Sequence, residues 1–446
     1  MESRDSEIGG ASMEWPKLLS ENRLRRPERP AREDAGRPRT RSPFQQDADL
    51  IVFSAAFRRL QDKTQVQPLS ESGRVRTRLT HSIEVASVGR SLGASVANVL
   101  AERRGLNGEQ VHAMGNILHA ACLAHDIGNP PFGHGGEDAI QGWFAAHPEA
   151  LSGLRADEAA GLLAFDGNAQ GFRTLTALEN HRFDGGLRLT EATLGAFMKY
   201  RVGAAERVRG SATLGLRKAG FFESERPYAE EVCAGLGLPA GVRHPLVYLT
   251  EAADDICYAI VDLEDGFEAG LLDHASAVEV LSELADTPAP VGLGRAEQLH
   301  KLRALAIGRM VEAVIEVFLD AEPALLSGQP VGELCLLTPL GPAVARAKEL
   351  ARARIFSAPS VVERLLGGQR TLITLLDNLV PVADALAEAG FDRASLGGRA
   401  RLIAQLLGEG YRPHDRFEAL LGITDFLSGL TDRAAVALAL RITGEG

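Results

Sequence analysis

The stretch "LAHDIGNPPFGHGGE", residues 123–137, decides the fold of this sequence. It follows the apolar run "ILHAACLA" and contains His125 beside Asp126, a break at Gly128 and two prolines, and then His134 and Glu137. Proline removes a helical hydrogen bond and glycine weakens a helix, so the pattern predicts a helix that ends near Gly128, a turn and a second helix. The turn therefore brings two pairs of ionisable side chains into one short segment.

The segments on either side of this stretch have the spacing of helices. Residues 47–66 carry apolar side chains three or four positions apart, at Leu50, Phe53, Phe57 and Leu60. Residues 80–100 predict a helix with Thr80 as its N-cap and a core stripe of Ile83, Val85, Val88 and Leu92. Residues 244–270 predict a long helix, and amphipathic stretches follow from about residue 276. Because no alternating strand pattern and no internal repeat occurs, the sequence predicts an all-α fold.

Composition limits the class of protein. The 446 residues are 45% hydrophobic, which is enough for a large core, and their net charge of −11 argues against a chain that coats nucleic acid. The four cysteines are scattered, as is typical of free thiols in a reducing compartment. No apolar run approaches the roughly 20 residues needed to span a bilayer, and the N-terminal stretch has no apolar signal core. We therefore expect a cytoplasmic protein without membrane segments.

The chain is expected to divide into three regions. Residues 1–46 are rich in Arg and Pro and predict a flexible, solvated arm, although such an arm can also contact a neighbouring subunit or a phosphate-bearing ligand. Residues 47–275 form the expected catalytic domain. Residues 276–446 form a C-terminal helical region that is expected to complete the fold and to make oligomer contacts.

Histidines and aspartates on separate predicted helices suggest a metal site. His81, the pair His125 and Asp126, and Asp254 each lie among apolar residues, where a charged side chain is costly to bury unless it is paired or bound to a metal. Each residue alone is weak support. Helices of a bundle can bring such ligands to one point, and imidazole with carboxylate suits divalent first-row metals.

His134 and Glu137 lie three residues apart and so share one face of the second predicted helix. A carboxylate at that distance can orient an imidazole and raise its pKa, as a general acid requires. The alternative is structural, with His134 capping the helix and Glu137 completing a capping box. The spacing alone leaves both interpretations open.

Two further patterns suggest a pocket for an anionic substrate. Asp254, Tyr258 and Asp262 form one stripe of the helix at 248–266, which can line a sugar pocket or place its acids in solvent. Basic residues cluster before the first histidine, and Lys199 and Lys218 follow later. Cations near a metal favour a phosphate ester as substrate, although each one alone is typical of a solvated surface. Neither a P-loop nor a dinucleotide-binding glycine motif is present.

Several segments together resemble a known family. They are "RSPFQQDADLIVFSAAFRRLQDKTQV", "TRLTHSIEVASVGRSL", "AHDIGNPPFGHGGEDAI", "DGNAQGFRTLTALENHRFDGGLRLTEATLGAFMKY" and "YLTEAADDICYAIVDLEDG". The chain resembles the deoxyguanosine triphosphate triphosphohydrolase-like branch of the HD-domain superfamily from about residue 15 to 270, and more weakly near "DFLSGLTDRAAVALALRITG". The resemblance implies an HD-domain helical fold with additional C-terminal helices.

The resemblance also implies the reaction and the roles of the residues. It implies hydrolysis of a deoxynucleoside triphosphate to deoxynucleoside and inorganic triphosphate, with a divalent metal (Mn, Mg, Fe or Co) held by His81, His125, Asp126 and Asp254. His134, positioned by Glu137, would be the catalytic acid. The implied substrate-binding residues are Asn168, Lys199, Tyr200 and Lys218 at the triphosphate, Arg78 near the phosphates, Gln65, Val66 and Asp262 at the 3′-hydroxyl, and Tyr258 at the 2′ position of the sugar.

Other implications and alternatives remain at this point. The family pattern suggests a homo-oligomer, for which a hexamer is one arrangement, and activation by dNTP or single-stranded DNA. The sequence departs from the pattern at Leu50, Asp166, Arg201 and Ala434, none of which belongs to the metal set. The alternatives are an HD-type phosphohydrolase acting on another nucleotide, such as a nucleotidase or phosphodiesterase, and a non-catalytic dNTP-sensing or nucleic-acid-binding regulator.

Overall fold

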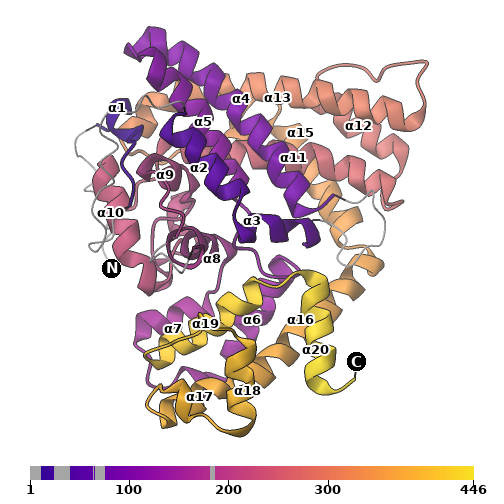
Figure 1. Ribbon diagram of the computed structural model, residues 1–446. Coiled ribbons are helices and arrows are strands. Elements are labelled where there is room, and N and C mark those ends of the chain that lie inside the picture. The colour runs from indigo at the N-terminus through magenta and orange to yellow at the C-terminus, as the bar shows by residue number, and fades with distance from the viewer. Residues whose placement is uncertain (1–11, 25–40, 64, 66–75, 181–185, 446) are drawn as a thin grey trace.

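The computed structural model describes residues 12–24, 41–63, 65, 76–180 and 186–445, and these form an all-helical protein (Figure 1). This part of the chain contains no named strand, and Arg23 and Thr190 form an isolated antiparallel bridge. The prediction of an all-α fold is therefore confirmed. None of the helices here combines the length and the apolar character needed to cross a bilayer.

The α-helices follow one another through the described residues. In order they are α1 (Trp15–Leu18), α2 (Pro43–Val52), α3 (Ala55–Arg59), α4 (Arg78–Arg104), α5 (Gly108–Ala124), α6 (His134–Ala146), α7 (Ala156–Leu163), α8 (Gly167–Arg173), α9 (Glu191–Phe197), α10 (Arg226–Leu236), α11 (Pro245–Glu268), α12 (His274–Leu284), α13 (Arg295–Leu326), α14 (Leu334–Leu337), α15 (Gly341–Ala351), α16 (Pro359–Leu379), α17 (Pro381–Glu388), α18 (Gly398–Leu406), α19 (Arg416–Ser428) and α20 (Asp432–Thr443).

Short 3-10 and π segments join several of these helices. The 3-10 turns are η2 (Leu60–Asp62), η3 (Pro148–Leu151), η6 (Ala204–Glu206), η7 (Leu214–Leu216), η8 (Glu223–Glu225) and η10 (Arg393–Ser395), and the π segments are η4 (Thr174–Leu178) and η9 (Arg352–Phe356). Both π segments continue the helix that precedes them.

Buried apolar side chains form two large clusters. The larger cluster joins α1, α2, α4, α5 and α9 to the helices from α10 to α15, with α4 packed along α5 and α11 packed on α4 and α13. The second cluster joins α6 and α7 to the helices from α16 to α20, with α16 packed on α6 and α20. Figure 1 shows these as an upper and a lower group of helices. The expected boundary at residue 275 stays a prediction, and the buried clusters do not follow it.

Part of the expected N-terminal arm is packed into the core. Trp15 and Leu18 are buried, and the indole Nε1 of Trp15 donates to Glu322 Oε1 of α13 at 2.8 Å. Burial of a tryptophan with its N–H satisfied favours the folded state. The prediction of a flexible arm is therefore wrong for residues 12–24, and α2 begins at Pro43 inside the expected arm. Residues 25–40 lie outside the described residues.

Two details of the predicted helices need correction. The N-cap of α4 is Thr77, because its side chain accepts from Thr80 N while the Thr80 side chain accepts from Thr77 N, so Thr80 lies in the first turn. Of the predicted core stripe, Val85, Val88 and Leu92 are buried, but Ile83 is 51% exposed and does not belong to it. Residues 47–66 are not one helix, since Ser54 starts a new helix and leaves Phe53 exposed at the end of α2.

The turn between α5 and α6 is held tightly by the surrounding helices. A Cβ on Gly128 would lie 2.0 Å from the backbone nitrogen of Gly171 on α8, so only glycine fits there. Phe132 has a left-handed backbone with φ of 64°, and its N–H donates to Asp432 Oδ1 at 3.0 Å. The turn that separates the two ionisable pairs therefore has a single packed conformation.

Candidate functional site

A cavity of about 600 Å³ lies between α4, α6, α8, α11 and α15 and collects the predicted site residues. All the predicted residues that the structure describes line it: Gln65, Arg78, His81, His125, Asp126, His134, Glu137, Asn168, Lys199, Tyr200, Lys218, Asp254, Tyr258 and Asp262. Val66 lies outside the described residues. Residues from segments almost 200 positions apart thus meet at one place, although their roles stay predictions.

The residues expected to bind metal form the centre of this cavity. One ligand atom each from His81, His125 and Asp126 lie within 4.8 Å of one another. Asp254 Oδ1 lies 3.0 Å from His81 Nε2 and 3.7 Å from His125 Nε2. The Nε2 of His125 is buried and has no hydrogen-bond partner among the described residues. A buried, unpartnered imidazole nitrogen beside two carboxylates is a donor set that fits a divalent cation.

Neighbouring groups fix the orientation of these side chains. The Nδ1 of His125 lies 2.7 Å from the carbonyl oxygen of Cys122, so it carries the proton and Nε2 is the lone-pair donor. Arg78 Nη1 donates to Asp126 Oδ2 at 2.8 Å, and the Asn129 amide donates to Asp126 Oδ1. Burial acts to raise the pKa of Asp126, but Arg78 and the two imidazoles lower it below its usual value. Asp126 is therefore held as a carboxylate.

The His134 imidazole lies at the edge of the same cavity, where it is 84% exposed. Its Nδ1 is 2.9 Å from Glu137 Oε2, and the other oxygen of Glu137 accepts from the N–H of Gly167 at 2.7 Å. The hydrogen bond that His134 donates to the carboxylate of Glu137 raises the pKa of His134. The residue before the helix is Gly133, which makes no side-chain cap, so Glu137 does not complete a capping box. The geometry is that of an oriented imidazole rather than a helix cap.

Two lysines line the same cavity. Lys218 Nζ lies 2.9 Å from Asp166 Oδ2, and Lys199 Nζ lies 3.3 Å from Glu251 Oε1. The side chain of Lys218 is 46% exposed to solvent and that of Lys199 is 36% exposed. Asp166 also accepts from the side chain of Asn168. These exposed ammonium groups can therefore contact an anionic ligand as well as their carboxylate partners.

The predicted stripe of α11 lines the cavity over three turns. Asp254 faces the histidines, and the Tyr258 ring stacks on Phe356 with a centroid distance of 5.7 Å. Asp262 is 2% exposed, and its Oδ2 has no hydrogen-bond partner in the described part of the chain. Burial raises the pKa of Asp262 to about 8. The alternative of a solvent-facing stripe therefore does not apply.

Several cavity residues were not foreseen from the sequence. Asn129 contacts Asp126, Glu251 contacts Lys199, and Lys348 of α15 donates to Asp255 at 2.8 Å. Asn129 lies within residues 123–137, and Glu251 lies one turn before Asp254. Their positions beside predicted metal ligands could therefore have identified both residues from the sequence. Lys348 and Phe356 come from ordinary amphipathic segments, and only the fold brings them here.

Comparisons with known proteins identify the relatives of this chain. Residues 78–194 match the HD domain family. The chain is 42% identical over 453 residues to a "Deoxyguanosinetriphosphate triphosphohydrolase-like protein" of Pseudomonas aeruginosa, covering 97% of this chain and 99% of that relative. It is 39% identical to a protein with the same description in Synechocystis, covering 97% and 99%. It is 30% identical to a "Deoxyguanosinetriphosphate triphosphohydrolase" of Yersinia pestis, covering 87% and 91%.

Proposed function

Because this chain belongs to the deoxyguanosinetriphosphate triphosphohydrolase-like family of HD-domain proteins, we propose that it hydrolyses deoxynucleoside triphosphates, dGTP or several dNTPs, to deoxynucleoside and inorganic triphosphate. The reaction depends on a divalent metal, for which Mn, Mg, Fe and Co are the candidates. It breaks the bond between the α-phosphorus and the sugar 5′-oxygen.

One observation carries the proposal. A single cavity contains a histidine and aspartate cluster, an imidazole held by a buried carboxylate, and two exposed lysines. A phosphate ester requires these three groups, because negative charge must be neutralised, a nucleophilic water generated and the leaving oxygen protonated.

The metal would be held by His81, His125, Asp126 and Asp254. Bound there, a divalent ion supplies Lewis acidity, which lowers the pKa of a water and stabilises charge at phosphorus. Arg78 and Asn129 keep the carboxylate of Asp126 in place. His134, held at Nδ1 by Glu137, presents its Nε2 to the cavity and donates a proton to the leaving 5′-oxygen.

The remaining residues would bind the substrate. Lys199, Tyr200, Lys218 and Asn168 contact the triphosphate, with Arg78 close by. Gln65, Val66 and Asp262 contact the 3′-hydroxyl. Tyr258, backed by Phe356, packs against the sugar where a 2′-hydroxyl would collide, which favours deoxynucleotides. The buried, unpartnered oxygens of Gln65 and Asp262 support this assignment, because both lack a hydrogen-bond partner among the described residues.

The family relationship also supports three broader proposals. The chain forms a homo-oligomer, which can be a hexamer. A dNTP or single-stranded DNA acts as activator. The protein works in the cytoplasm, where its substrates are made.

The test is product analysis. Purified protein is incubated with the four dNTPs, singly and mixed, in the presence of each metal, and intact triphosphate is separated from pyrophosphate and phosphate. Release of triphosphate with a matching amount of deoxynucleoside supports the proposal. Release of phosphate alone, or turnover of a monophosphate or cyclic phosphodiester, would support the alternative phosphohydrolase. A silent protein whose melting temperature rises with dNTP would support a sensor.

A further inference from the structure

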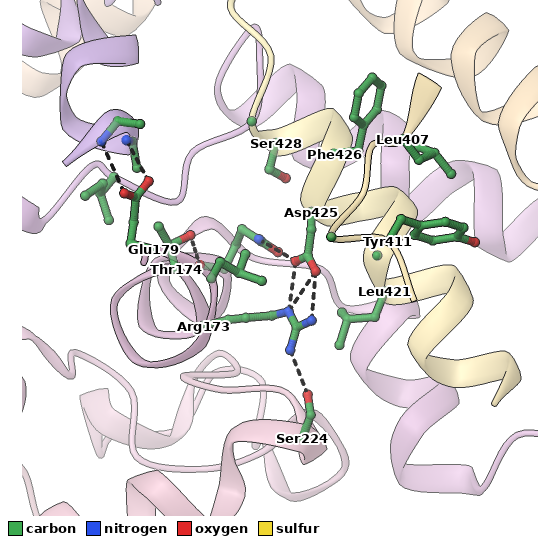
Figure 2. A pocket seen from close by; sticks show the side chains of 18 of the residues that line it. Arg173, Thr174, Glu179, Ser224, Leu407, Tyr411, Leu421, Asp425, Phe426 and Ser428 are labelled. Carbon is green, nitrogen blue, oxygen red and sulfur yellow. Dashed lines mark hydrogen bonds and ion pairs between the residues drawn. The ribbon is translucent and has the colours of Figure 1, made fainter. Parts of the chain in front are cut away.

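A second cavity of about 610 Å³ lies on the other side of the turn between α5 and α6 (Figure 2). It is formed by α3, the end of α8 with η4, and the stretch from α18 to α19. Apolar side chains such as Ile127, Leu407 and Leu421 make up part of its wall. Its volume is within the range of roughly 300–1,000 Å³ that is usual for small-molecule sites.

The buried charges of this cavity already satisfy one another. Arg173 donates to Asp425 through Nε and Nη2 at 2.8 Å each, and through Nη1 to Glu225 at 2.5 Å, as Figure 2 shows in part. Glu179 accepts from the backbone N–H groups of Ala55 and Ala56, at 3.1 and 2.8 Å. In contrast to the exposed lysines of the first cavity, Arg173 is only 14% exposed, so a charged ligand would have to break a buried ion pair.

Two buried polar atoms in the wall remain without a partner. Within the described part of the chain, neither Gln170 Oε1 nor Ser428 Oγ has a hydrogen-bond partner, although both residues are more than nine-tenths buried. The Gln170 amide nitrogen donates to Asp425 at 2.8 Å, and Ser428 lies one turn after Asp425 on the same face of α19. One acceptor and one hydroxyl are therefore left over beside a neutralised ion pair. Unsatisfied buried groups of this kind are rare and call for a partner.

We infer that this second cavity binds an uncharged molecule with an apolar ring and a hydrogen-bond donor close to an acceptor, of the class of a deoxynucleoside or its free base. The donor satisfies Gln170 Oε1, and the acceptor takes the hydroxyl proton of Ser428. The choice of deoxynucleosides rests on the proposed function, because that reaction releases them.

The second cavity shares a wall with the first. Ile127, next to Asp126, lines the second cavity, and so does Lys63, whose buried ammonium donates to the carbonyl oxygens of Asn129 and Ser428 at 2.6 Å each. On α8, Asn168 lines the first cavity while Gln170 lines the second. A molecule in the second cavity therefore contacts the segments that hold Asp126 and Asn168.

The experiment is calorimetric titration of metal-free protein with 2′-deoxyguanosine and with thymidine, compared with the corresponding 5′-monophosphates. Ser428→Ala removes the unpartnered hydroxyl, and Leu178→Trp fills the cavity. Ser282→Ala is the matched control, because its hydroxyl is also buried and unpartnered among the described residues but lies on α12. dNTP hydrolysis is measured separately on the same preparations.

The expected result is two nucleoside sites per chain, the second of which disappears in Leu178→Trp. Ser428→Ala is expected to weaken that site about three- to tenfold, as loss of one hydrogen bond does, without lowering the melting temperature. Ser282→Ala is expected to leave both sites unchanged. Should Leu178→Trp fail to fold, the comparison of the two serine variants decides the question.

Other outcomes would overturn the inference. They are a single nucleoside site that neither Ser428→Ala nor Leu178→Trp affects, or equally tight binding of the monophosphates at the second site. Because binding is measured without metal or substrate, failure of hydrolysis with intact two-site binding would refute the proposed function alone.

Discussion

The contact between His134 and Glu137 leads to a quantitative prediction for Glu137→Gln. The amide can still accept from the N–H of Gly167, so the fold should be unaffected, but the negative charge beside the imidazole is lost. A charge-assisted hydrogen bond contributes about 1.5–3 kcal/mol when buried, and an exposed ion pair contributes about 0.2–1 kcal/mol. Because Glu137 is buried and His134 is exposed to solvent, we take a value between these ranges, about 1.4 kcal/mol, which corresponds to about a tenfold change in rate.

The sign follows from the direction of the shift. Glu137 raises the pKa of His134, so the imidazole stays protonated to higher pH and can act as an acid there. In Glu137→Gln the pKa of His134 falls, and the alkaline decline of kcat should begin at a lower pH. At low pH the variant and the wild type should converge. On the alkaline side the variant should be about tenfold slower.

The assay is release of triphosphate from dNTP across the pH range at saturating substrate and fixed metal. Asp138→Asn is the matched control, since it removes a charge from the adjacent residue, which also lines the cavity. It should leave the position of the decline unchanged. The reasoning would be refuted by an unshifted decline in Glu137→Gln, or by an equal loss of kcat at every pH, which would indicate that Glu137 only orients the ring.

Three further predictions concern the metal, a buried acid and the turn. His125→Ala should lose bound metal in elemental analysis, whereas His134→Ala should keep the metal and lose about 10²–10⁴-fold in kcat; normal metal content and activity in His125→Ala would contradict the assignment. Asp262→Asn should stabilise metal-free protein by about 1–3 kcal/mol at pH 8 to 9 but not near pH 4. The pKa of Asp262 is raised in the folded protein, so the free energy of unfolding of the wild type falls as the pH rises from about 4 to 8. A difference in melting temperature that does not change with pH would argue against this prediction. Gly128→Ala should destabilise the protein by about 1–3 kcal/mol or more, because the new Cβ would collide with the backbone of Gly171. Gly142→Ala on α6, where a Cβ meets open space, should be neutral or stabilise the protein by up to about 1 kcal/mol. Equal melting temperatures of the two variants would refute the packing argument.

The helical class was predictable from the sequence, and the predicted site residues that the structure describes line one cavity, although their roles stay predictions. Helices were recognisable because apolar spacing and N-caps are local features, although the N-cap of α4 is Thr77, three residues before the expected Thr80. The cavity residues were found through family resemblance combined with unusual chemistry, such as an aspartate amid apolar residues at position 254. Their joint position in one cavity agrees with that reading.

What the sequence could not predict depends on long-range packing. Lys348 reaches Asp255 only because α15 packs on α11. Trp15 is buried because Glu322, some 300 positions away, accepts its N–H, whereas the Arg- and Pro-rich surroundings suggested a free arm. The second cavity had no sequence signal, since its unpartnered groups are an ordinary glutamine and serine.

The contacts between the C-terminal helices and the turn between α5 and α6 also have a consequence for biosynthesis. Phe132 N–H is anchored by Asp432, 300 positions later, and Lys63 by the carbonyl of Ser428. At about 5–20 residues per second, a ribosome needs roughly 15–60 s to travel between the two partners of the first contact. During that time the nascent chain contains the turn between α5 and α6 without the hydrogen bonds to Asp432 and Ser428. A chain that ends before Ser428 therefore lacks both of these hydrogen bonds to the turn and to Lys63.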